Sequence, residues 1–306
     1  MKKIVLTISV LLLLGTGCIM GSSSKSIEEI NAATEGLDLK IGSTITLTQT
    51  VLGVGGKVVD FFGGESAERK LTLVDWQTGQ HVKLAWFMQI PVETAASIAE
   101  QSAYDARYAR VPIGEKIPPK PVKTFETKTR EGSIATSGLA KSHAILLPVT
   151  WHEGDEGTKQ DNSLIWISTE QYDELTQTKK TVLNLGLFDD SLSFALGISD
   201  SIHNLVNTLQ KDAQKVQDKE DLLSVHAEPD WGTFTLVVDG KETTVQTIQA
   251  SNWFGRYTIL ASRDNPLILE VVLSPASKGS LNIFSREKFL NAFAGYKVTK
   301  INMPAS

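Results

Sequence analysis

Five side chains that could bind a metal ion lie close together in the sequence, between residues 152 and 161. They are His152, Glu153, Asp155, Glu156 and Asp161. A calcium loop would place oxygen ligands at alternating positions around a tight glycine, and this segment lacks that register. A zinc site would need a second imidazole or a thiolate at short spacing, which is also missing. We therefore interpret the segment as a solvated acidic loop and expect no metal or other cofactor.

Two Ser-x-x-Lys pairs could in principle support nucleophilic catalysis. This pattern resembles the serine-lysine motif of β-lactamase-like enzymes, in which the lysine takes the proton of the serine hydroxyl. Ser22 and Lys25 lie in a polar segment that would not hold the two groups together. Ser285 and Lys288 begin an expected helix, but a helix N-cap explains Ser285 without catalysis. We expect no catalytic residue here.

A glycine-rich segment at residues 51–64 invites comparison with a phosphate-binding loop. Val58 follows Lys57 at the position where the magnesium-binding hydroxyl of such a loop would stand. Val58 also replaces the third glycine of a dinucleotide-binding turn. The segment is therefore interpreted as bulged or flexible β-structure.

Aromatic side chains supply one candidate binding surface. The six tryptophans lie in or beside expected strands, where most aromatic residues belong to the core. Trp253, Phe254, Arg256 and Tyr257 form the best candidate patch, because aromatic rings beside an arginine near a turn suit recognition.

The only cysteine, Cys18, directly follows an apolar run at the N-terminus. Lys2 and Lys3 precede residues 4–14, which are nearly all apolar, and residues 15–17 are small. A basic start, an apolar stretch of about a dozen residues and a small-residue exit are typical of an export signal. The run is shorter than the stretch of about 20 residues that a membrane-spanning helix needs.

This arrangement resembles the signal peptide of bacterial lipoproteins, although Gly15 stands where that pattern prefers leucine. The resemblance implies that residues 1–17 are cleaved. Cys18 would then become the first residue and carry a thioether-linked diacylglycerol and an N-acyl group, in which palmitate is a usual chain. Two or more acyl chains give stable anchoring. In a Gram-negative cell, Ile19 in place of aspartate implies the periplasmic face of the outer membrane.

The composition is consistent with such a localisation in the cell envelope. The formal net charge is −5, and removal of Lys2 and Lys3 makes it more negative. An acidic domain argues against nucleic acid and against electrostatic adhesion to anionic headgroups. No cysteine follows Cys18, so no disulfide framework is available.

Four segments are expected after the signal peptide. Residues 18–40 are an acylated, flexible tether containing a short helix at residues 27–33, and residues 41–111 are a β-rich part with one helix beginning at Pro91. Residues 112–122 are a proline-rich connector of polyproline type. Residues 123–306 are an α+β part, which either stands alone or shares one sheet with residues 41–111.

The fold class is α+β, with mainly antiparallel sheets and a few amphipathic helices. Period-two alternation and turn residues predict hairpins around Gly79 and around Asp239-Gly240. The C-terminal part is expected to form an antiparallel meander with one helix after Ser285. Further expected strands lie at residues 144–151, 164–167 and 182–187, and further helices at residues 168–176 and 189–216.

Three functions follow from these expectations. The first is a membrane-anchored envelope lipoprotein with a non-catalytic binding or assembly role, whose partner is an envelope protein. The second is a periplasmic carrier of a lipid or other hydrophobic ligand, which predicts an apolar cavity. The third is an unrecognised envelope hydrolase, which predicts a pocket with a polar triad or a perturbed carboxylate or histidine.

Overall fold

The computed structural model describes residues 27–50, 68–109, 117–148, 151, 153, 158–184, 224–252, 255–273 and 295–304. Several expected features lie outside these residues. They are Cys18 with its signal segment, the glycine-rich segment at 51–64, the helix at 189–216 and the helix after Ser285.

The described residues form a sheet-dominated α+β fold with three helices and twelve strands. The helices are α1 (Ile27–Glu35), α2 (Ala95–Tyr108) and α3 (Thr169–Thr178). The strands are β1 (Thr44–Thr50), β2 (Glu68–Gln77), β3 (His81–Glu93), β4 (Phe125–Thr136), β5 (Thr158–Lys159), β6 (Lys180–Val182), β7 (Ser224–Ala227), β8 (Gly232–Val238), β9 (Lys241–Ser251), β10 (Gly255–Leu260), β11 (Ile268–Leu273) and β12 (Gly295–Asn302).

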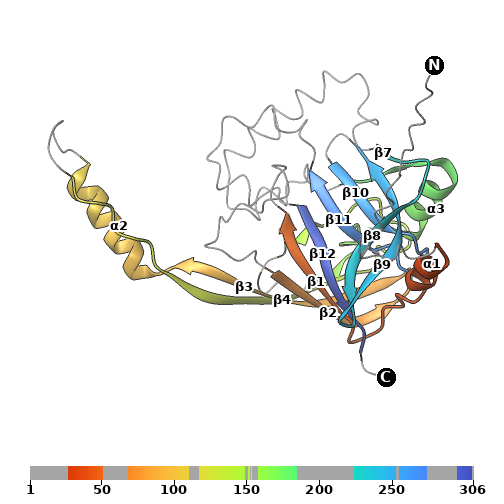
Figure 1. The fold of residues 1–306 in the computed structure, drawn as a ribbon, viewed down its shortest axis with the longest axis horizontal. Coiled ribbons are helices and arrows are strands. Elements are labelled where there is room, and N and C mark those ends of the chain that lie inside the picture. Colours follow the sequence, from red (N-terminus) through yellow and green to blue (C-terminus); the bar gives the residue numbers. More distant parts are fainter. Residues whose placement is uncertain are drawn as a thin grey trace, which may run out of the picture.

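All twelve strands belong to one sheet, in the order β5-β4-β3-β2-β1-β12-β11-β10-β9-β7-β6. β8 pairs with both β9 and β12, so β8, β9, β10, β11 and β12 form a closed ring. The β8–β12 and β4–β5 pairings are parallel, and the other pairings are antiparallel. β1 pairs with β12 along its whole length, which carries the sheet outward from the ring to β4 (Figure 1). Strands from both sides of residues 112–122 therefore share this sheet.

Period-two alternation produces the buried face of the sheet. In β1, Ile45 and Leu47 are buried, while Thr44 and Thr46 on the opposite face are only half-buried. The predicted hairpins are confirmed. Gly79 has a φ of 64°, and Asp239 and Gly240 have φ values of 48° and 79°, as a type I′ turn requires.

The short helix predicted from Ser168 or Thr169 is also confirmed. In α3, Gln171 donates its backbone N–H to the Ser168 hydroxyl, and Ser168 donates its backbone N–H to the Gln171 side chain. This capping box satisfies two of the helix's free donors. The helix ends with Lys179 in the left-handed region, at a φ of 60°.

Two predicted strands are wrong. The described residues 144–148, 151 and 164–167 contain only isolated bridges, Ala144 to Asn184 and Trp166 to Leu267. Their apolar side chains nevertheless lie in the core, including Leu164 and Trp166. A short apolar run predicts burial, and an irregular segment that fills the core has the same pattern as a buried strand.

The prediction that the flexible tether extends to residue 40 is also wrong. Leu37 and Leu39 are each only 2% exposed, and they belong to the main core. Thr34 accepts the backbone N–H of Gln246 at 2.7 Å through its hydroxyl oxygen. The folded body therefore already includes α1 and residues 36–40.

Pro91 does not begin a helix. β3 continues through Pro91 to Glu93, and α2 begins after the N-cap Thr94, whose hydroxyl accepts the backbone N–H of Ser97 at 3.2 Å. β2 pairs with β3 only as far as Met88. Among the described residues, β4 is the only neighbour of β3 beyond that point, so a residue without an N–H is tolerated there.

Candidate functional site

The structure divides the predicted aromatic patch. Trp253 and Phe254 lie outside the described residues, Arg256 is exposed, and Tyr257 is fully buried. Adjacent residues of a strand face opposite sides, so Arg256 and Tyr257 of β10 cannot share a surface. The Tyr257 hydroxyl lies 3.1 Å from the side-chain oxygen of Asn252 and donates to it. The assignment of Tyr257 to a binding surface is therefore wrong.

The acidic segment is described only at Glu153 and Asp161, because His152, Asp155 and Glu156 lie outside the described residues. Ser285 and Lys288 also lie outside them. In the part of the chain that the structure describes, no group of three or more His, Cys, Asp or Glu side chains could hold a metal ion.

The most distinctive feature is a projection that we call the arm, formed by residues 89–109 and 117–130. Every residue of β4 pairs with β3, from Phe125 opposite Glu93 to Thr136 opposite Val82. Because the pairing of β2 with β3 ends at Arg69 and Met88, the outer part of the β3–β4 pair is a two-stranded ribbon among the described residues. The ribbon leads away from the body of the sheet and carries α2 at its far end (Figure 1).

Polar contacts hold α2 against the chain that returns to β4. Tyr104 donates its hydroxyl to the carbonyl of Pro118, and Gln101 donates its side-chain amide to the carbonyl of Pro121. The Ser97 hydroxyl oxygen accepts the backbone N–H of Thr124 at 3.2 Å. The described part of the proline-rich connector is thus one side of the arm, and it does not link two separate sheets.

Apolar side chains on the arm are exposed. Ile98 is 51% exposed, Val122 is 84% exposed and Phe125 is 50% exposed. Among the described residues, no buried apolar side chain of the core lies between Trp86 and Ile134. The arm therefore adds surface to the protein without adding to its hydrophobic core.

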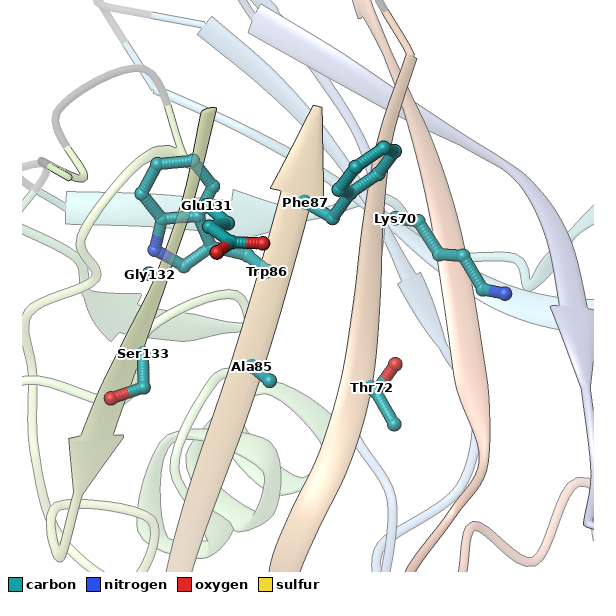
Figure 2. A pocket seen from close by; sticks show the side chains of 8 residues that line it. All are labelled: Lys70, Thr72, Ala85, Trp86, Phe87, Glu131, Gly132 and Ser133. Atoms are coloured by element: carbon teal, nitrogen blue, oxygen red, sulfur yellow. The ribbon is translucent and has the colours of Figure 1, made fainter. Parts of the chain in front are cut away.

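A groove of about 680 Å³ lies at the base of the arm, across β2, β3 and β4 (Figure 2). Lys70, Phe87 and Glu131 are opposite one another on the three strands, and the smaller side chains of Thr72, Ala85 and Ser133 form the next row. No ion pair joins Lys70 or Glu131 to another described residue. The groove is an open contact surface with one cation, one carboxylate and one exposed ring.

A half-buried arginine, Arg69, lies on the opposite face of β2. The guanidinium carbon of Arg69 is 4.7 Å from the ring centroid of Trp86 and 5.6 Å from that of Trp151. Arg69 donates to the carbonyl of Pro148 and to the sulfur of Met88. Burial, followed by repulsion from Arg130, lowers the pKa of Arg69 to about 10. These contacts hold Pro148 and Trp151 against the sheet.

No protein-family model, curated protein or solved structure matches this chain. Among the described helices, none combines the length and the apolar character needed to cross a membrane.

The sequence contains features that indicate the arm, but the prediction of a helix beginning at Pro91 did not use them. Thr94 is a good N-cap residue, and the apolar and polar residues of 81–93 extend the expected strand without a break. Residues 117–124, which include the prolines at 118, 119 and 121, belong to neither a helix nor a strand.

Proposed function

We propose that this chain is a membrane-anchored envelope lipoprotein with a non-catalytic binding or assembly role, and that the arm is its binding element. The observation that carries this proposal is the exposure of apolar side chains on a projection whose described residues supply no buried apolar side chain to the core. Exposed apolar surface of this kind marks interaction sites in soluble domains.

The shape of the arm supports the same proposal. A two-stranded ribbon is only marginally stable by itself in water. Here α2 has just two buried residues, Ser97 and Gln101, and both bond to the returning chain. A partner that covers the arm would bury apolar area at little further cost in conformational entropy, because the arm is already ordered.

The anchor rests on the lipobox resemblance around Cys18. Attachment through Cys18 would hold the folded body, which already includes α1, close to the membrane surface. A Cys18→Ser variant of the full chain should lose palmitate labelling and appear in the soluble fraction. Labelling that persists in this variant would refute the anchor without bearing on the arm.

Removal of the arm tests the binding role. Met88 and Arg130 are directly opposite each other, so an Asn-Gly turn could join them and replace residues 89–129. We expect this variant to unfold cooperatively at nearly the wild-type temperature and to stay on the membrane. The complex that chemical cross-linking captures in intact envelopes should disappear.

Arg256→Ala provides a matched control, since Arg256 is exposed on the body. This substitution should leave the cross-linked complex unchanged. If the complex survives loss of the arm, the binding role belongs elsewhere in the chain.

A further inference from the structure

Residues 117–123 have a conformation that their sequence largely determines. Pro118, Pro119 and Pro121 each hold φ near −65°, and a residue that precedes proline is pushed toward extended values. The segment belongs to neither a helix nor a strand. A polyproline helix, with three residues per turn, is the conformation that fits these restraints.

Residues on two of the three faces of such a helix make polar contacts within the arm. Pro118 and Pro121 share one face, and their carbonyls accept hydrogen bonds from α2. Lys120 and Lys123 share the next face. Lys120 lies 2.9 Å from a carboxylate oxygen of Asp105, within α2.

Lys123 lies 3.0 Å from a carboxylate oxygen of Glu93. The pKa of Glu93 is lowered by hydrogen bonds from Ser97 and then from Lys123. Both lysines of the segment are therefore paired within the arm.

The third face carries only apolar side chains. Pro119 is exposed, and Val122, three residues later, is 84% exposed. Phe125, the first residue of β4, lies just beyond the proline-rich segment and is 50% exposed. We call Pro119, Val122 and Phe125 the ridge.

We propose that the ridge docks in a groove lined by aromatic side chains on a partner protein, in the manner of polyproline recognition. This inference rests on the proposed function and names the chemistry of its partner. Aromatic grooves bind such segments because the ligand is preformed and loses little entropy on binding. An acidic groove is disfavoured, since Lys120 and Lys123 already have carboxylate partners.

A photo-reactive phenylalanine analogue in place of Phe125 tests the proposal in the full chain, in envelopes of cells that produce it naturally. The same analogue at Phe87, which is 41% exposed in the groove at the base of the arm, is the matched control. We expect an adduct with a different protein from position 125 only. The attachment site should map to a partner peptide rich in Trp, Tyr or Phe. A synthetic peptide of residues 117–125 should compete with adduct formation.

Two substitutions in the same background locate the contact. Val122→Asp should reduce adduct yield about tenfold, because a carboxylate would be buried without a partner. Ile117→Asp makes the same kind of change on the lysine-bearing face and should leave the yield unchanged.

Several outcomes would overturn the inference. They are an adduct with lipid or with a second copy of this chain, attachment to a peptide without aromatic residues, and equal yields for the two substitutions. If arm removal abolishes the complex while Val122→Asp does not, the binding role of the arm stands and the ridge is wrong. If arm removal also has no effect, both proposals fail.

Discussion

The guanidinium of Arg69 lies over the indole of Trp86, with 4.7 Å between the guanidinium carbon and the ring centroid. Trp151 contacts the same group at 5.6 Å, and its indole N–H donates to the carbonyl of Leu146. The cation is thus stabilised by aromatic faces and by hydrogen bonds to Pro148 and Met88. Cation–aromatic contacts of this kind contribute about 0.5–2 kcal/mol each.

We predict that Arg69→Lys destabilises the protein more than Arg69→Met does. Lysine keeps the charge but loses the planar stacking, and an ammonium group is harder to remove from water than a guanidinium group. We expect a loss of about 1–3 kcal/mol for lysine and a smaller loss for methionine. Urea unfolding followed by tryptophan fluorescence measures both. The reverse order would mean that the charge at position 69 has a role of its own.

Gly132→Ala should be destabilising because of its neighbour. A Cβ at this position would lie 2.9 Å from three atoms of the Trp86 indole, which is buried in the core. Overpacking of this kind costs about 1–3 kcal/mol. The loss should shrink in a Trp86→Phe background, where the ring is smaller, so a double-mutant cycle should show coupling. Additive effects would show that strand strain, and not the indole, causes the loss.

The parts of the fold that the sequence predicted are those that local chemistry determines. Period-two alternation predicted β1, and the turn residues Gly79 and Asp239-Gly240 predicted two hairpins. Ser168, a good N-cap residue, predicted the start of α3. The ring closure between β8 and β12 was not predictable, because it joins residues about 60 positions apart through two residue pairs with no local signal.

The candidate site was less predictable than the fold. The local sequence around Pro91 fits a helix start as well as a strand with one neighbour. The pairing of β2 with β3, which ends at Arg69 and Met88, decides between the two. Similarly, the local sequence does not determine which face of the sheet a strand residue such as Tyr257 occupies. The neighbouring strands and the closed ring determine which face is buried.

Stability should fall as pH rises above about 10. Burial raises the pKa of Tyr257 and of Tyr296 above the ordinary value of 10.0. The unfolded chain releases these protons near pH 10 while the folded chain retains them, so each tyrosine lowers stability by about 1.4 kcal/mol per pH unit above that pH. The lowered pKa of Arg69 acts in the opposite direction, because the folded state then releases its proton first.

The comparison of wild type with Tyr257→Phe cancels the effect of Arg69. We expect the slope of unfolding free energy against pH, between about 10 and 11, to become less steep by about 1.4 kcal/mol per unit. At neutral pH the variant should lose about 1 kcal/mol, because the hydrogen bond to Asn252 is gone. Identical slopes would show that Tyr257 ionises equally in both states.

Substitutions before residue 41 test where the folded body begins. Leu37 and Leu39 are each 2% exposed, and the carbonyl of Leu37 accepts the side-chain N–H of Asn265 at 3.1 Å. Leu37→Ala and Leu39→Ala should therefore each cost about 2–5 kcal/mol, as large-to-small changes in a core do. Ile41→Ala is the matched control, since Ile41 is 59% exposed, and should change stability by about 0.5 kcal/mol or less. If all three substitutions were equally mild in chemical denaturation, residues 27–40 would behave as a tether. A large loss at Leu37 and Leu39 alone would show that these two residues belong to the folded body and not to a tether.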